Sequence, residues 1–446
     1  MLENYKNIYF LGIGGIGMSS LALYLINQNK AVGGYDKVKS KITDTLIKGG
    51  AIINFDDKFK TIPKSFLNKD NTLIVYTPAI PHSNNQFTFF KERGFVIIKR
   101  SELLGEISKD KFCIAIAGTH GKTTTSSILS HILFDNGLNF TSFIGGISEN
   151  YNTNLIQNGS EIILVEADEF DRSFLTLNPN IACITSIDPD HLDIYENEKD
   201  LKKSFNHFKN NIKKDGFLFV NDTISMNGLT YGFKSKSDYF ISNYRIVNQI
   251  VLFDINFKNS KISIQFKMPG RHNALNALVA FAIGNNLGID SENIKKSLST
   301  FEGVKRRFTY VLKSPKVIID DYAHHPSEID AVKKSVKEIY PGKKITAVFQ
   351  PHLYTRTRDF MDQFAESLSD FDEIILTDIY PAREQPIDNI DSKALLKKIK
   401  NKHKLISKKS NLSSCLINSK SDVFVIMGAG DISDEVQSIK QKIELL

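Results

Sequence analysis

Short apolar runs recur along the chain, and most of them are followed by a glycine turn or by a helical spacing of apolar positions. Near-continuous apolar runs are expected for parallel strands that are buried on both faces. Their alternation with helical patterns predicts a doubly wound α/β architecture. The strands expected on this basis are residues 8–11, 72–76, 95–98, 112–116, 161–166, 181–187, 317–321, 345–350, 373–377 and 422–427.

The pattern falls into three segments, and we expect three α/β domains that span residues 1–107, 108–310 and 311–446. The first and third show the strand–helix alternation of Rossmann-like domains. The middle segment begins with a phosphate-loop signature. It also contains two alternating strands between residues 249 and 268, separated by a turn at Lys258, which predict a hairpin. A helix is expected from about residue 272 to residue 287.

The most informative segment is residues 117–125, which read AGTHGKTTT directly after the apolar run 112–116. Glycines let backbone N–H groups converge on phosphate oxygens, and the start of a helix adds partial positive charge. Lys122 is expected to hold β- and γ-phosphates, and the Thr123 hydroxyl is expected to bind Mg²⁺. The strict pattern has a glycine where Ile116 stands, so this is a variant loop that still predicts nucleotide binding.

A second glycine-rich turn, GIGGIG at residues 12–17, follows the expected strand 8–11. Asp36 lies at the end of the next strand, where a dinucleotide-binding fold places its ribose-binding acid. Taken alone, this segment would predict a nicotinamide-binding domain. Its physical content is only a cradle for a diphosphate at the start of a helix, so the nucleotide it binds stays open.

Acidic residues follow the two strands expected beside the phosphate loop. Glu166 ends one of these strands, where a Mg²⁺ ligand is expected. Asp168, Glu169 and Asp171 are interpreted partly as a solvated acidic loop and are weaker candidates for the metal than Glu166. His191 lies among three carboxylates after the next strand and is a candidate for a second metal position.

Polar residues also follow strands in the third segment, at 320–325 and at 350–358. An arginine there could bind a carboxylate through two parallel hydrogen bonds. The stretch 303–308 offers the paired guanidinium groups of Arg306 and Arg307 for a phosphate. Because ligands collect at the carboxyl ends of parallel strands, this distribution predicts a binding site in each segment.

Composition narrows the class of protein. Apolar residues make up 41% and charged residues 24%, as in ordinary globular proteins. The net charge of +7 is spread over many lysines, which argues against a nucleic-acid-binding patch. Cys113, Cys183 and Cys415 form no CxxC pair and no metal spacing, as expected in a reducing compartment. With no signal peptide and no run long enough to span a bilayer, we expect a cytoplasmic protein without stable membrane insertion.

A set of stretches in a characteristic order resembles the Mur ligase family over almost the whole chain. They are GIGGIGM (12–18), GTHGKTTT (118–125), EADEFDRSFL (166–175), DPDHLDIY (188–195), PGRHNALNA (269–277), GVKRRF (303–308), DDYAHHPSE (320–328), QPHLYTRTRD (350–359) and MGAGDI (427–432). The resemblance implies an N-terminal UDP-sugar domain, a central ATPase domain and a C-terminal domain that receives an amino acid. Within the family it points to the branch that joins L-alanine to the lactyl carboxylate of UDP-N-acetylmuramate through an acyl phosphate, in peptidoglycan synthesis.

The resemblance also implies ATP and Mg²⁺ as cofactors, with roles for particular residues. ATP contacts are implied for Gly118, Thr119, His120, Gly121, Lys122, Thr123, Thr124, Asn273, Arg307 and Asp321. Among them Asn273 would face the adenine, Arg307 the γ-phosphate and Asp321 the ribose. Mg²⁺ would be held by Thr123, Glu166 and His191.

For the other substrates, the resemblance places the UDP-sugar at Gly12, Gly14, Gly15, Gly17 and Asp36. The amino-acid carboxylate is expected at Arg356 and Tyr322. Catalytic roles are implied for Lys122, His191, Arg307 and His324. The base that deprotonates the amine stays open between His324, a nearby carboxylate and the phosphate itself.

Some positions depart from the family pattern, and other functions stay open. Leu353 stands where many members have arginine, which affects the amino-acid contacts. Tyr35 replaces a serine, and YTPAI (76–80) replaces the more usual SSAI, which affects the UDP-sugar contacts. The nearest alternative is a murein tripeptide ligase, whose N-terminal loop usually departs from GIGGIGM. A nicotinamide-dependent oxidoreductase would leave Lys122 and Glu166 unexplained, and these intact positions also argue against a regulator that has lost catalysis. We expect a monomer or a homodimer.

Overall fold

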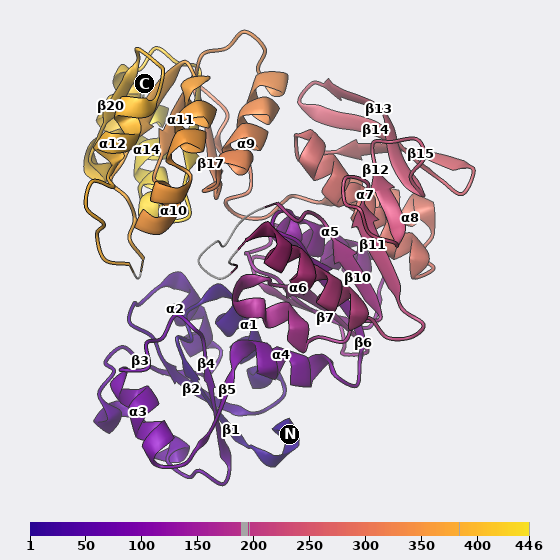
Figure 1. Ribbon diagram of the computed structural model, residues 1–446, viewed down its shortest axis with the longest axis vertical. Helices are drawn as coiled ribbons and strands as arrows, with labels where there is room; N and C mark the ends of the chain where they lie inside the picture. The colour runs from indigo at the N-terminus through magenta and orange to yellow at the C-terminus, as the bar shows by residue number, and fades with distance from the viewer. Residues whose placement is uncertain (189–194, 196, 383, 446) are drawn as a thin grey trace. The chain divides into compact units, whose positions relative to one another are not determined.

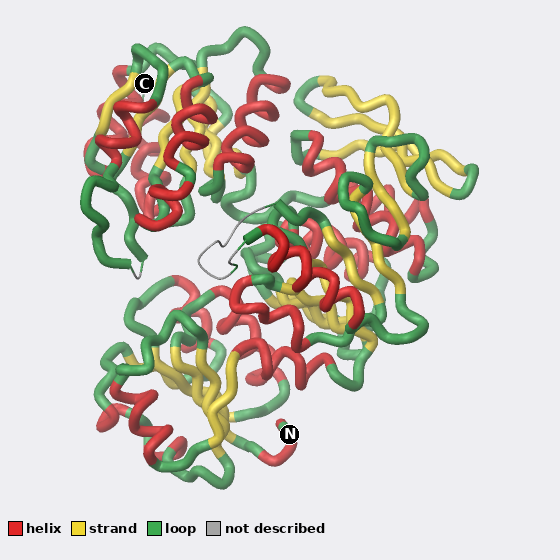
Figure 2. The backbone as a smooth tube through the Cα atoms, viewed as in Figure 1, coloured by secondary structure: helices red, strands yellow, loops and turns green. Residues whose placement is uncertain are grey.

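The computed structural model of the chain describes residues 1–188, 195, 197–382 and 384–445. Three β-sheets, each flanked by helices, make up the mixed α/β fold that the apolar pattern predicts (Figure 1, Figure 2). The chain divides into two compact units: residues 1–242, 254–264 and 275–301 form the first, and residues 243–253, 265–274 and 302–446 form the second. Among the described residues, no helix is long and apolar enough to cross a membrane.

The first sheet has five parallel strands in the order β3-β2-β1-β4-β5. The strands are β1 (Asn7–Leu11), β2 (Ala31–Tyr35), β3 (Ile52–Asn54), β4 (Thr72–Tyr76) and β5 (Val96–Lys99). The helices are α1 (Ile16–Asn27), α2 (Lys41–Lys48), α3 (Asn85–Glu92) and α4 (Arg100–Ser108). Ile8 and Phe10 pack into one apolar cluster, whereas Tyr9 and Leu11 pack into another. Both faces are therefore covered, which explains the continuous apolar run of β1.

The second sheet has ten strands in the order β15-β14-β13-β12-β11-β10-β6-β9-β7-β8. The strands are β6 (Phe112–Ala117), β7 (Phe140–Phe143), β8 (Leu155–Gln157), β9 (Ile162–Ala167), β10 (Ile181–Ile184), β11 (Phe217–Asn221), β12 (Leu229–Gly232), β13 (Tyr239–Val247), β14 (Ile250–Phe257) and β15 (Ser260–Phe266). The helices are α5 (Lys122–Asp135), α6 (Glu198–Asn210), α7 (Arg271–Asn286) and α8 (Ser291–Thr300). Strand β6 pairs in parallel with β9 on one side and β10 on the other, so the three strand ends meet at one edge.

The third sheet has six strands in the order β16-β17-β21-β18-β19-β20. The strands are β16 (Thr309–Leu312), β17 (Val317–Asp321), β18 (Ile345–Phe349), β19 (Glu373–Leu376), β20 (Lys404–Ile406) and β21 (Val423–Met427), and β16 alone is antiparallel to its neighbour. The helices are α9 (Pro326–Ile339), α10 (Tyr354–Asp359), α11 (Met361–Ser369), α12 (Ser392–Lys398), α13 (Leu412–Asn418) and α14 (Val436–Glu444). Phe424 packs into a cluster with α13 and α14, and Val425 packs into a second one with α9, α11 and α12.

The predicted strands lie within one residue of the observed ones, apart from the run 181–187. Strand β10 ends at Ile184, because the residues after it turn toward the phosphate loop. The expected hairpin strands are β14 and β15, and the expected helix 272–287 is α7. The first sheet and strands β6 to β12 of the second sheet lie in the same compact unit, so the domain boundary at residue 107 stays a prediction.

Candidate active site

The phosphate loop joins the end of β6 to the start of α5 at Lys122. Gly118 and Gly121 have φ angles of +131° and +84°, in the left-handed region that favours glycine. A Cβ atom at Gly118 would lie 2.1 Å from the Thr185 hydroxyl oxygen, so no other residue fits there. The turn therefore leads directly into the amino end of α5, which is the arrangement that binds anions.

Two residues that follow β10 hold this loop in shape. The Thr119 amide donates to the Ser186 carbonyl at 3.1 Å, and the His120 amide donates to the Ser186 hydroxyl at 2.8 Å. The Thr185 hydroxyl donates to the Ala117 carbonyl at 3.1 Å. Both loop amides are thus used inside the protein. The apolar pattern places Thr185 and Ser186 in the strand, although polar residues directly after an apolar run are a signal for a site.

Lys122 lies beside a carboxylate that our sequence reasoning placed in solvent. The Lys122 ammonium donates to the Gly118 carbonyl at 2.6 Å and to the two Glu169 oxygens at 2.9 and 2.6 Å. Glu169 is fully buried, so its interpretation as part of a solvated acidic loop is wrong. Asp168 keeps 36% of its side chain exposed. Burial lowers the pKa of Lys122, but the charges of Glu169 and Asp168 outweigh it and raise that pKa.

Thr123 and Glu166 form the oxygen-rich side of the loop. The Thr123 hydroxyl donates to Glu166 Oε2 at 3.0 Å, and the Gly145 amide donates to Glu166 Oε1 at 2.5 Å. Burial raises the pKa of Glu166, and the Gly145 N–H bond and the Lys122 charge partly offset the rise. Hydroxyl and carboxylate oxygens are the hard ligands that Mg²⁺ prefers, and this ion usually takes few protein ligands beside phosphates and water. The two residues fit such an ion.

The structure does not extend this metal site to a third residue. His191 lies outside the described residues, as do residues 189–194 around it. Within the described part of the chain, no group of three or more His, Cys, Asp or Glu side chains is placed to hold a metal. The role of His191 therefore stays a prediction.

Helix α7 supplies a residue that the sequence reasoning missed. The Thr125 hydroxyl donates to Asn276 Oδ1 at 3.2 Å, and a Cβ atom at Gly121 would lie 2.7 Å from the same oxygen. Asn276 of α7 thus holds the first turn of α5 and lies against Gly121 of the loop. Asn273, expected at the adenine, donates its side-chain amide to the Pro269 carbonyl at 2.6 Å.

The second glycine turn, between β1 and α1, is closed by Asp36. Gly14 donates its amide to Asp36 Oδ2 at 2.7 Å, and Val38 donates to Asp36 Oδ1 at 3.1 Å. Gly12 has a φ angle of +87°, and a Cβ atom there would lie 2.7 Å from Thr77. The carboxylate that we expected at a ribose therefore also shapes the turn itself. Gly15 caps α1, and Gly17 lies in its first turn.

Arg100 and Asn154 connect this turn to the elements around the phosphate loop. The Asn154 side chain is buried and donates to the Ile16 carbonyl at 2.6 Å and to the Ser19 hydroxyl at 2.9 Å. Arg100 lies 3.7 Å from Asp168, and a Cβ atom at Gly17 would lie 2.8 Å from its guanidinium. Both residues were missed, because their partners are distant in the sequence.

In the second unit, Arg306 and Arg307 both lie against one aromatic ring. Their guanidinium carbons lie 5.0 and 5.1 Å from the centroid of the Tyr322 ring. Arg307 also lies 3.9 Å from Glu328. Asp321 accepts backbone N–H groups from Phe308 and Ala323, each at 2.7 Å, and burial raises its pKa to about 6. Its contact with an ATP ribose stays a prediction.

His324, the candidate base, is oriented by its neighbours. Its Nδ1 atom lies 2.9 Å from the Tyr322 carbonyl oxygen and 3.2 Å from Glu328. The ring also packs edge-on against Tyr322, with centroids 5.2 Å apart. Arg356 is buried in α10, which Leu353 precedes with a φ angle of +70°, an unusual conformation for a branched residue. The roles of Arg356 and Tyr322 toward an amino acid stay predictions.

Comparison with known proteins decides the family. Residues 7–112 match the model "Mur ligase family, catalytic domain", residues 116–284 match "Mur ligase middle domain", and residues 306–430 match "Mur ligase, glutamate ligase domain". A Flavobacterium psychrophilum protein named UDP-N-acetylmuramate–L-alanine ligase is 50% identical over 99% of each chain. The chain belongs to the Mur ligase family.

Solved structures agree with this assignment. The UDP-N-acetylmuramate–alanine ligase of Thermotoga maritima matches this Mur ligase with a TM-score of 0.84 and 28% identity, over 98% of this chain and 99% of the other. A murein peptide ligase from Psychrobacter arcticus has the same fold, with a TM-score of 0.74 and 22% identity over 99% of each chain. Mur ligases are ATP-dependent ligases, which accounts for the phosphate loop.

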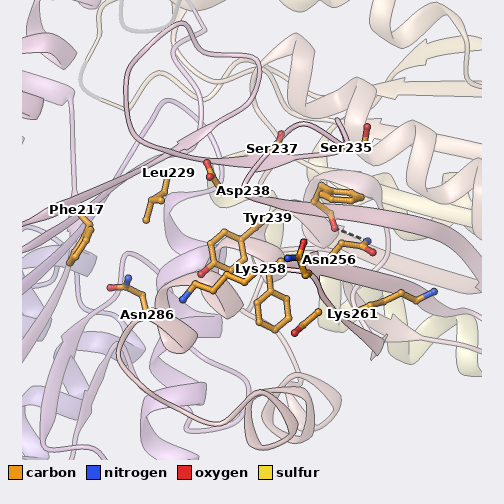
Figure 3. Close-up of a pocket in the computed structure, with 14 residues that line it drawn as sticks. Phe217, Leu229, Ser235, Ser237, Asp238, Tyr239, Asn256, Lys258, Lys261 and Asn286 are labelled. Carbon is orange, nitrogen blue, oxygen red and sulfur yellow. Dashed lines mark hydrogen bonds between the residues drawn. The ribbon is translucent and has the colours of Figure 1, made fainter.

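The Mur ligase also has an open cavity of about 680 Å³ along strands β11 to β15, near Tyr239 and Lys258 (Figure 3). None of the residues that line it belongs to the predicted site. Lys258 and Asn259 form the turn between β14 and β15, and the Tyr239 ring stacks on Phe257 with centroids 5.8 Å apart. The cavity is therefore separate from the phosphate loop, because β10 lies between β11, the nearest strand that lines the cavity, and β6, which the loop follows.

Proposed function

We propose that this Mur ligase joins L-alanine to the lactyl carboxylate of UDP-N-acetylmuramate and converts ATP to ADP and phosphate. The observation that carries the proposal is the phosphate loop, where Lys122 and Thr123 start α5 beside Glu166. A second glycine cradle lies in the same compact unit, as two nucleotide substrates require. The names of close relatives over the full chain support L-alanine as the acceptor.

In the first step, a lactyl carboxylate oxygen attacks the γ-phosphorus of ATP, the bond to ADP breaks, and an acyl phosphate forms. Two anions approach one another, and each pair of like charges at 4 Å costs about 4 kcal/mol at an effective dielectric near 20. Lys122 offsets this repulsion at the β- and γ-phosphates, and Arg307 is proposed to do so at the γ-phosphate. Thr123 and Glu166 would hold Mg²⁺, with His191 as the predicted third ligand, and the bound ion would neutralise phosphate charge.

In the second step, the neutral amine of L-alanine attacks the acyl carbon, and the bond to phosphate breaks. Arg356 and Tyr322 are proposed to bind the alanine carboxylate. If Nδ1 of His324 donates to the Tyr322 carbonyl, Nε2 is left as the acceptor for the amine proton. A carboxylate or the departing phosphate are the alternative bases.

We further propose that the reaction takes place in the cytoplasm, and that the enzyme is a monomer or a homodimer. Its described cysteines are all unpaired, which suits a reducing compartment. Size-exclusion chromatography with light scattering tests the oligomeric state.

The deciding experiment measures phosphate release with ATP, Mg²⁺ and UDP-N-acetylmuramate in the presence of one acceptor at a time. L-alanine, glycine, L-serine and the murein tripeptide are compared, and the products are weighed by mass spectrometry. We expect the highest kcat/KM with L-alanine. Turnover with the tripeptide alone would assign the chain to the recycling branch instead.

A further inference from the structure

Three acceptor atoms of the protein already surround the Lys122 ammonium. They are the Gly118 carbonyl oxygen at 2.6 Å and the two Glu169 oxygens at 2.9 and 2.6 Å. An ammonium group has three N–H donors and no acceptor. A phosphate oxygen that binds the Lys122 ammonium must therefore share an N–H group with one of these three acceptors or displace that acceptor.

The backbone of Glu169 is held in place by hydrogen bonds from neighbouring residues. Its backbone carbonyl accepts the Tyr195 hydroxyl at 2.7 Å and the Arg172 amide at 3.0 Å. Tyr195 is itself buried, and the Arg172 guanidinium lies 5.4 Å from the centroid of its ring. Arg172 in turn binds Asp200 at 2.7 Å. These contacts hold the backbone from which a fully buried carboxylate reaches the lysine of the phosphate loop.

We infer that Glu169 is a positioning residue that holds the Lys122 ammonium and competes for it with the nucleotide phosphates. The inference rests on the proposed role of Lys122 at ATP. A buried carboxylate that loses its cation is costly, since burial of an unpaired charge is unfavourable. When a nucleotide binds, its phosphate replaces Glu169 as a partner of Lys122. Glu169 therefore weakens nucleotide binding, although it keeps the lysine side chain aligned.

Glu169→Gln tests this exchange, because glutamine keeps the shape and removes the charge. The probe is Mg²⁺ with a non-hydrolysable ATP analogue, measured by calorimetry and by its effect on the thermal midpoint. We expect a dissociation constant about tenfold lower than that of the wild type. The nucleotide-free variant should melt earlier, and saturating nucleotide should raise its midpoint by more than it raises that of the wild type.

Glu292→Gln is the matched control, because it breaks the exposed Lys295–Glu292 pair on α8. It should change neither the dissociation constant of the ATP analogue nor the thermal midpoint. Unchanged or weaker binding by Glu169→Gln would overturn the inference. If that variant does not fold alone, it should be recovered in the presence of the nucleotide, and failure of this rescue would also overturn it. A wild-type chain that binds no nucleotide would refute the proposed function instead.

Discussion

Asn154 donates its side-chain amide to the Ile16 carbonyl at 2.6 Å, in the first turn of α1. The contact joins the glycine cradle of the first sheet to the segment that follows β7. In the same segment, Ile144 donates its amide to the Asn154 carbonyl at 3.0 Å, and Gly145 donates to Glu166 at 2.5 Å. A short, hydrogen-bonded stretch of chain therefore connects the two glycine turns, and under the proposed function their spacing would set the approach of the carboxylate to the γ-phosphate.

Asn154→Ala should raise the KM for UDP-N-acetylmuramate more than the KM for ATP. It leaves the Ile16 carbonyl without this buried donor and lowers the free energy of unfolding by about 1–3 kcal/mol. Steady-state kinetics and thermal unfolding measure the two effects. Asn27→Ala is the control, because it removes an exposed contact from α1 to Gln157 and should change neither. Equal effects of the two substitutions would contradict the role of Asn154.

Lys122→Ala should abolish phosphate release and also lower stability. Removal of the ammonium leaves Glu169 buried without its cation, which costs about 3–5 kcal/mol. The double variant Lys122→Ala/Glu169→Gln should regain much of the thermal midpoint and remain inactive. Circular dichroism measures the thermal midpoint, and a phosphate assay measures activity. A fully active single variant would contradict the assignment of the phosphate loop.

Glu166→Gln should increase the Mg²⁺ concentration needed for half-maximal activity and lower kcat about 10²-fold or more. The amide keeps an oxygen but loses the charge that attracts the cation. Thr123→Val should shift the Mg²⁺ requirement in the same direction, whereas Thr123→Ser, which keeps the hydroxyl, should restore it. A Mg²⁺ titration at saturating ATP provides the measurement. An unchanged titration in both Glu166→Gln and Thr123→Val would remove these residues from the metal site.

Asp320→Asn should stabilise the protein above neutral pH. Burial raises the pKa of the Asp320 carboxyl to about 6, against the attraction of Arg306. Because folding raises this pKa, the carboxyl favours the folded state at low pH, and that stability is lost as the pH rises through about 6. Asparagine cannot ionise, so the variant should be more stable at pH 8 by roughly 1–3 kcal/mol. Thermal midpoints from pH 4 to pH 8 should converge at the acid end, and parallel curves would refute the assignment.

The sequence places a residue in the fold when its neighbours along the chain mark the end of a strand or the start of a helix, whereas its role in catalysis stays a prediction. Lys122 and Thr123 start α5 after the turn that follows β6, and Glu166 lies at the end of β9, so apolar runs mark their places without knowledge of the fold. Glu169 could not be found in this way, because its partner Lys122 is 47 positions away. An acidic residue in an acidic run is interpreted as solvated until that partner is known. Asn154 lies 138 positions from Ile16, and its role depends on packing of α1 beside β8.

In the proposed mechanism, a lactyl carboxylate is activated as an acyl phosphate and then captured by L-alanine. UDP-N-acetylmuramate labelled with ¹⁸O in both carboxylate oxygens, incubated with ATP, Mg²⁺ and L-alanine, tests it directly. One ¹⁸O atom should appear in the released phosphate for each UDP-N-acetylmuramoyl-L-alanine formed. Unlabelled phosphate, or labelled phosphate that forms without the L-alanine product, would contradict the account.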